Sequence, residues 1–253
     1  MPQGYCSLCG SFCELTFEHV PPRSAFNKKT RYKIVPFEKV LKSENILEAN
    51  FSAKIEQGGL GYYSLCNKCN NFLGLNYVKS YSAYSNSFIE FAKKTQFNFF
   101  SLTMHDFEAA KVLKQIVSMF LSLNSWDFAK ENPDLREYVL NPESKNLPQK
   151  IRVFSYLNSE GQIRTSTFSV IGNLKSSATI LASEITFPPL GHVMTIDFKG
   201  HLPNHFELTE FKNVSHNELI TTDFNLYRLP TYLPFPLDYR QKTEIEDVIQ
   251  KNK

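Results

Sequence analysis

Long hydrophobic runs are missing from this chain of 253 residues. The best candidate, Ile116–Leu123, contains two serines and is far shorter than the roughly 18 apolar residues of a membrane span. The first residues show no basic stretch followed by an apolar one, so they lack the pattern of a secretory signal. Apolar residues still make up 42% of the composition, which is enough for a packed core. We therefore expect a folded cytoplasmic protein with no membrane partner.

Cysteine is absent from the last 184 residues. The five cysteines present are Cys6, Cys9, Cys13, Cys66 and Cys69. Their odd number, together with the missing secretory signal, argues against a disulfide framework. Four of them form two C-x-x-C pairs, at 6–9 and 66–69, and two such pairs are typical of a zinc site with four thiolate ligands. Because four thiolates leave no open position for water, the predicted Zn²⁺ is structural.

Two alternatives remain for the cysteines. Cys13 is either a free thiol or a replacement for Cys9 as a zinc ligand, although the C-x-x-C spacing favours Cys9. The pairs also match redox-active C-x-x-C motifs, but no βαβ pattern surrounds them.

The positive charge is unevenly distributed along the chain. The net charge is +3, yet residues 1–80 carry ten Lys and Arg against six Asp and Glu. No acidic residue interrupts the segment between His19 and Phe37. This segment includes Arg23, Lys28, Lys29 and Arg31. An unopposed basic run suits contact with a polyanion, and a solvated loop is the ordinary alternative.

The segment between the two C-x-x-C pairs predicts two strands, and a helix follows the second pair. Residues 15–20 predict a strand that Pro21 and Pro22 end, and residues 62–65 predict a short strand after a Gly58–Gly59 turn. A helix is expected to begin near Cys69. Glu18 and His19 are adjacent, so on a regular strand they would face opposite sides, whereas a bulge or a strand end would bring both near one site.

The pieces CSLCG, LTFEHVPP and GGLGYYSLCNKCNN, in this order, resemble the HNH endonuclease superfamily. The resemblance covers about the first 80 residues and implies a ββα-metal core built on a treble-clef zinc finger. It also implies metal-dependent hydrolysis of DNA phosphodiester bonds, and it is compatible with a role in bacterial defence. It leaves room for an activating protein or a homodimer partner.

The same resemblance assigns roles to individual residues. It makes His19 the general base, and it makes Glu18 and Asn70 the ligands of a catalytic Mg²⁺ or Mn²⁺. Such chemistry needs a base that titrates near neutrality and a hard cation held by oxygen ligands. The basic side chains that would contact nucleic-acid phosphates are Arg23, Lys28, Lys29 and Arg31. The ordinary alternatives are a surface histidine, a solvent-facing glutamate and a helix-capping asparagine, and Asn71 can exchange roles with Asn70.

The sequence departs from the family pattern at four points, and two of them, the long insertion and the missing middle asparagine, favour a second hypothesis. Glu stands for the commoner Asp at 18 and Asn stands at 70, and 46 residues separate His19 from Cys66. The middle asparagine of the motif is expected near Gly61, where none stands, and Asn45 or Asn50 would have to serve instead. The alternative is therefore a zinc-finger module without catalysis that binds nucleic acid or a protein.

The remaining residues, 81–253, predict an α+β domain with helices at about 81–140 and strands at about 150–222. A helix over 76–96 carries the aromatic stripe Tyr77, Tyr81, Tyr84, Phe88 and Phe91. Further helices are expected over 107–123, capped by Asp106, and over 134–140. Strands are expected over 151–158, 164–174, 178–187 and 191–198, with a fifth over 206–211. The second domain would position the substrate, form a dimer or act as a sensor.

Overall fold

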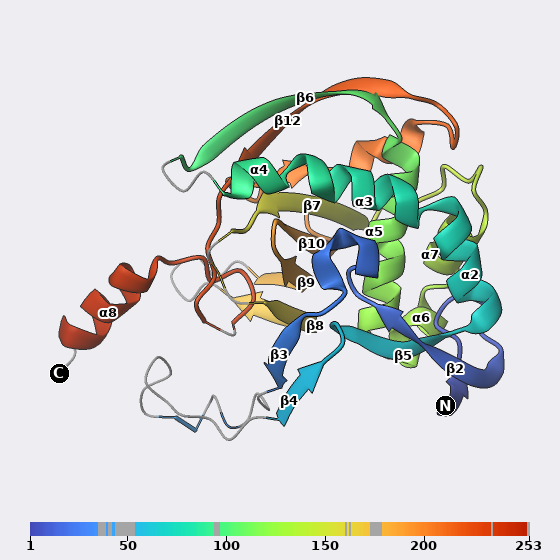
Figure 1. The fold of residues 1–253 in the computed structure, drawn as a ribbon, viewed down its shortest axis with the longest axis horizontal. Coiled ribbons are helices and arrows are strands. Elements are labelled where there is room, and N and C mark those ends of the chain that lie inside the picture. The colour runs from blue at the N-terminus through green and yellow to red at the C-terminus, as the bar shows by residue number, and fades with distance from the viewer. Residues whose placement is uncertain are drawn as a thin grey trace.

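The computed structural model describes residues 1–34, 39, 42–43, 54–93, 97–159, 161, 163–172, 179–233 and 235–251. It has the predicted α+β fold class, with the cysteines in an N-terminal part made of a small sheet and the helix that follows it, a layer of helices and a larger antiparallel sheet (Figure 1). Among the described residues, no helix has the length and apolar character needed to cross a membrane.

The N-terminal part contains a three-stranded antiparallel sheet in the order β1-β2-β5. Its strands are β1 (Gln3–Tyr5), β2 (Phe12–His19) and β5 (Gly61–Cys66), and helix α2 (Asn67–Asn76) follows β5 directly. The chain between β2 and β5 contains the helical turn η1 (Arg23–Asn27) and the hairpin β3 (Arg31–Ile34) with β4 (Lys54–Gln57). The predicted order of two strands and a helix around the C-x-x-C pairs is confirmed.

The predicted helix over 76–96 is divided by two breaks. The structure has α3 (Val78–Ser87) and α4 (Ile89–Ala92) in its place, and Tyr77 and Phe88 stand at the breaks. Both rings are fully buried, and the Tyr77 hydroxyl donates to the carbonyl oxygen of Val139 at 2.7 Å. The stripe is therefore core, as predicted, but packing and hydrogen bonding of its rings bend the helical segment.

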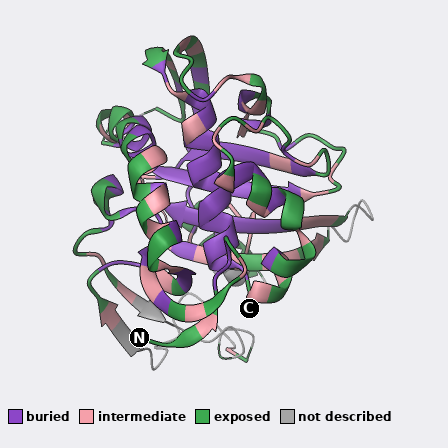
Figure 2. Ribbon diagram, turned by 90° about the vertical axis from the view of Figure 1, so that its right-hand side faces the viewer, coloured by how far each residue is buried: buried purple, intermediate pink, exposed green. Residues whose placement is uncertain are grey.

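Helix α5 (Ala109–Leu123) is the centre of the molecule, and all its residues except Lys111 are buried. Figure 2 shows this helix as a continuous buried column with buried strands around it. The prediction that it begins at Phe107 with Asp106 as its cap is wrong. Asp106 instead is the last residue but one of a strand, β6 (Phe99–Phe107), in a left-handed conformation with φ 51°. Alternating side chains, with Phe100 buried and Leu102 half-buried, make this segment a strand.

Strand β6 pairs with β12 (Ile220–Tyr227) in an antiparallel ribbon that arches over the helices (Figure 1). Below it lies a five-stranded antiparallel sheet in the order β11-β7-β10-β9-β8. Its strands are β7 (Ile151–Leu157), β8 (Arg164–Gly172), β9 (Thr179–Phe187), β10 (Leu190–Ile196) and β11 (Phe206–Glu207). Four of the predicted strands are confirmed, and the fifth shrinks to two residues before the helical turn η2 (Thr209–Asn213).

The remaining helices are α6 (Trp126–Glu131), α7 (Pro133–Leu140) and α8 (Lys242–Lys251). Helix α7 confirms the prediction over 134–140, while α6 was not predicted. One buried cluster includes Leu65 and Leu73 from the N-terminal part together with Leu113 and Val153 from the rest. The domain boundary near residue 80 stays a prediction, and apolar packing across that position is continuous.

Candidate functional site

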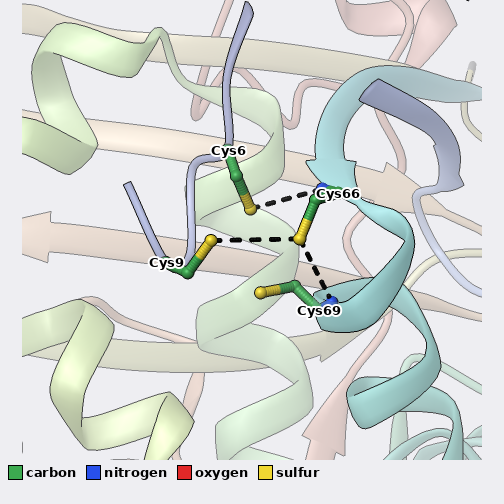
Figure 3. A group of neighbouring side chains, drawn as sticks. All are labelled: Cys6, Cys9, Cys66 and Cys69. Carbon is green, nitrogen blue, oxygen red and sulfur yellow. Dashed lines mark hydrogen bonds between the residues drawn. The ribbon is translucent and has the colours of Figure 1, made fainter. Parts of the chain in front are cut away.

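The first feature of the site is the cluster formed by four of the five cysteines. The Sγ atoms of Cys6, Cys9, Cys66 and Cys69 all lie within 4.8 Å of one another (Figure 3). Zn–S bonds of about 2.3 Å in a tetrahedron place sulfur atoms about 3.8 Å apart. The Sγ atoms of Cys9 and Cys66 are 3.9 Å apart. The four side chains are therefore spaced as a zinc finger requires, and this prediction is confirmed at that level.

Local sequence explains how each pair of cysteines presents its sulfur atoms. Gly10 closes the first turn with φ 79°, and its N–H donates to the carbonyl oxygen of Cys6 at 2.9 Å. Cys66 is the N-cap of α2, and its Sγ accepts the backbone N–H of Cys69 at 3.4 Å. A hydrogen bond between the Cys6 and Cys69 thiols lowers the pKa of Cys6 and raises the pKa of Cys69, so Cys6 is the first of the two to form a thiolate.

Cys13 lies outside this cluster. Its Sγ donates to the carbonyl oxygen of Ser11 at 3.4 Å, and its side chain is half-buried. The structure thus groups Cys9, rather than Cys13, with the other three cysteines.

His19 is the last residue of β2 and is half-buried. Its Nε2 lies 3.1 Å from the carbonyl oxygen of Gly58. A carbonyl only accepts, so Nε2 carries the proton and Nδ1 keeps its lone pair. Burial lowers the pKa of His19, the positive charge of Arg23 lowers it further, and the bond to Gly58 opposes both. The ring is therefore neutral near pH 7, as a general base must be.

Two glycines make room for this ring. Gly58 and Gly59 have φ values of 107° and 112°, a region that side chains other than glycine rarely adopt. A Cβ atom at Gly59 would lie 2.6 Å from Cδ2 of His19 and 2.3 Å from the carbonyl oxygen of Asn27. The Gly58–Gly59 turn therefore fixes how closely the chain approaches the imidazole.

Asn27 is the residue that the sequence interpretation missed. Its buried amide donates to the carbonyl oxygens of Pro21 at 2.6 Å and Leu60 at 2.7 Å, and its Oδ1 accepts the N–H of Leu60 at 2.8 Å. These bonds join the chain leaving β2 to the chain entering β5, as the family resemblance would expect of a middle asparagine.

The expected position for that role, near Gly61, is occupied by a residue without a side chain. A Cβ atom there would lie 2.1 Å from the carbonyl oxygen of Glu18. The other two candidates, Asn45 and Asn50, lie outside the described residues. The sequence did contain a clue to this residue, since Asn27 is the only asparagine between His19 and Asn45.

Glu18 is buried, with 6% of its surface exposed, so the solvent-facing alternative is wrong. Within the described part of the chain, its carboxylate has neither a hydrogen-bond donor nor an ion-pair partner. Desolvation raises its pKa to about 7. A buried carboxylate of this kind is stable as an anion only beside a cation, which agrees with a role as a metal ligand.

Asn70 lies in the first turn of α2, close to β2. Its Nδ2 donates to Oγ1 of Thr16 at 3.1 Å, and Oδ1 is left as an oxygen ligand. The capping alternative is wrong because Cys66 caps this helix, and Asn71 instead contacts Asn67 on the exposed side.

Strand alternation decides which of these residues share a face. Asn70 reaches Thr16 of β2 from α2, and a register shift in the pairing of β2 with β5 separates Thr16 from Phe17 and Glu18. His19 projects from the same side of β2 as Phe17, whose ring it contacts, and the buried Glu18 between them projects from the other side.

The predicted phosphate contacts are solvent-exposed. Arg23, Lys28, Lys29 and Arg31 lie in η1, the following turn and the start of β3. Arg23 is close enough to His19 to influence its pKa.

Comparisons with models of known families, with curated proteins and with solved structures find no match for this chain.

Proposed function

We propose that this protein is a metal-dependent endonuclease of the HNH type that hydrolyses phosphodiester bonds of DNA. The observation that carries the proposal is the setting of His19. Its imidazole is held on the Gly58 carbonyl by a loop that Asn27 braces, on the same β2–β5 pair of strands that leads to the cluster of four cysteines. A neutral ring with a fixed tautomer and a free Nδ1 is prepared to accept a proton.

In the proposed reaction, Nδ1 of His19 takes a proton from a water molecule. The resulting hydroxide attacks phosphorus, the bond from phosphorus to the leaving oxygen breaks, and a solvent proton neutralises that oxygen. The Nε2–H bond to Gly58 holds the ring as positive charge develops on it. Each cycle ends when the imidazolium returns its proton to solvent.

Glu18 and Asn70 would hold the catalytic divalent ion. A buried carboxylate with no partner among the described residues and the amide oxygen of Asn70 are the hard oxygen ligands that Mg²⁺ and Mn²⁺ prefer. When bound, such an ion supplies charge relief on the scissile phosphate and the leaving oxygen. Zn²⁺ in the cysteine cluster would have a structural role only.

The exposed basic residues beside His19 would contact phosphates of the substrate. Arg23, Lys28, Lys29 and Arg31 provide unopposed positive charge, which strengthens binding to any nucleic acid at low salt. The preference for DNA, a role in bacterial defence and an activating or homodimeric partner rest on the family resemblance.

A second candidate is a zinc-finger module that binds nucleic acid or protein without catalysis. The observation that favours it is the projection of Glu18 and His19 from opposite faces of β2.

The two candidates are separated by a nicking assay. We expect the purified protein to nick a supercoiled plasmid with Mg²⁺ or Mn²⁺ and to lose activity in EDTA. His19→Ala should reduce the rate about 10²–10⁴-fold, because it removes the base. The matched control is His201→Ala, at an exposed histidine in the chain after β10, and it should keep the wild-type rate. DNA binding without cleavage by wild type and variant alike would favour the binding module.

A further inference from the structure

The outer face of the β2–β5 hairpin carries a row of aromatic rings next to His19. Phe17 and His19 project from the same side of β2, with ring centroids 5.1 Å apart. Tyr63 of β5 lies opposite Phe17, and their ring centroids are 5.3 Å apart. The neighbouring residues face inward, since Tyr62 bonds Thr165 of the large sheet at 2.7 Å. The row therefore belongs to the water-facing side of the hairpin.

This row is accessible to a ligand. Tyr63 has 52% of its surface exposed, and Phe17 is half-buried. Gly61 allows Phe17 to lie across the hairpin, because a Cβ atom at position 61 would come within 2.8 Å of the Phe17 ring. Neither Phe17 nor Tyr63 belongs to the buried core.

The turn after β2 adds a further exposed ring among the cations. Phe26 is 41% exposed and has φ 69°, a conformation uncommon for residues other than glycine. Its neighbour Asn27 reaches the Gly59 position beside His19, so this turn adjoins the predicted base. Exposed Arg23, Lys28 and Lys29 lie in the same segment.

Exposed rings combined with cations suit an unpaired nucleic-acid strand. Rings stack on base faces, and cations follow the phosphates. In an intact duplex the base faces are already stacked inside the helix, so they are not offered to a protein ring. A row of rings ending at the predicted base would place an unstacked base beside the bond to be cut.

We infer that the protein recognises single-stranded or locally unpaired DNA, with Tyr63 and Phe17 as stacking residues next to the scissile phosphate. This inference rests on the proposed endonuclease function and specifies its substrate.

The test compares the affinity of the zinc-bound full chain for a fluorescein-labelled single strand of about 20 nucleotides and for the matching duplex. No divalent ion is added, so that binding is measured without cleavage. We expect tighter binding of the single strand. Tyr63→Leu should weaken that binding about 5- to 100-fold and leave duplex binding within twofold, because it removes one stacked base. Tyr63→Phe, which keeps a ring, should retain the preference.

The matched control is Tyr227→Leu, which removes an exposed tyrosine from the β6–β12 ribbon, where its ring centroid lies 4.9 Å from that of Phe99. It should change neither affinity. Equal or tighter duplex binding, or a Tyr63→Leu protein that binds like wild type, would overturn the inference, while plasmid nicking would still support the endonuclease. A protein that binds neither DNA would overturn both.

Discussion

At the scale of single residues, Asn27 holds the site together. One buried amide makes three hydrogen bonds across the loop, and the same loop carries the carbonyl that orients His19. The role depends on spatial contacts between residues 33 positions apart. Such contacts explain why the family pattern predicts roles for Glu18, His19 and Asn70 along the sequence but does not predict the hydrogen bonds of Asn27.

Asn27→Ala should therefore impair both stability and cleavage. It leaves the N–H of Leu60 buried without a partner, so we expect a loss of about 1–3 kcal/mol in the free energy of unfolding, measured by urea titration. Nicking should also fall, because the Gly58 carbonyl is no longer held against the imidazole. The bound zinc should remain.

Asn71→Ala is the matched control, since among the described residues the side chain that it removes makes one exposed contact of 3.4 Å, with Asn67. It should behave like wild type. An Asn27→Ala protein with unchanged stability and unchanged nicking would show that the loop does not depend on this amide.

The burial of Glu18 is also a property that the sequence alone does not reveal. Alternation predicts only that Glu18 and His19 face opposite sides. Which side is covered depends on where α2 and the large sheet pack, and the structure places Glu18 on the covered side. The same packing moves Tyr62 inward and leaves Tyr63 on the surface.

At the scale of elements, the cysteine cluster clasps two distant turns. It joins the β1–β2 turn, which carries Cys9, to the junction of β5 and α2, which carries Cys66. These two cysteines are 57 positions apart in the sequence. The spacing of the pairs was sufficient to predict this contact, because each C-x-x-C pair can present two thiolates to the same metal ion.

Cys66→Ser should remove the zinc and unfold the N-terminal part. Cys66 is a predicted zinc ligand, and structural zinc contributes directly to folding, whereas serine can still cap α2, so the variant removes the metal ligand without removing the cap. We expect zinc measured by mass spectrometry to fall from about one ion per chain to none. Circular dichroism should show a loss of structure.

Cys13→Ser should keep its zinc, since Cys13 lies outside the cluster. A soluble and well-folded Cys66→Ser protein without metal would contradict the clasp.

In the helical region, the spacing of residues predicts which side chains are buried, but it does not predict where the helices break. The aromatic stripe predicted burial correctly, because its spacing depends only on the helical period. The breaks at Tyr77 and Phe88 depend on what the buried rings touch, such as the carbonyl of Val139. Strand β6 was missed because its partner β12 lies more than a hundred positions later, as the bond between Thr103 and Asp223 illustrates.

At the scale of the whole molecule, the fold class followed from sequence because residues 151–196 alternate in short β-branched stretches separated by turns. The sequence did not predict how the large sheet packs against the β2–β5 hairpin. The structure connects the two through continuous apolar packing and through the hydroxyl bond between Tyr62 and Thr165. The site of the proposed chemistry is therefore supported by the large sheet as well as by the zinc clasp.

The most direct test of the account is anomalous X-ray diffraction from crystals soaked in Mn²⁺, recorded at the zinc and manganese edges. We predict one zinc peak among the four Sγ atoms and one manganese peak bounded by the Glu18 carboxylate and Oδ1 of Asn70, absent in Glu18→Gln. A zinc peak with no manganese peak at those oxygens would contradict the endonuclease. An empty cysteine cluster in a folded protein would contradict the clasp on which the site is built.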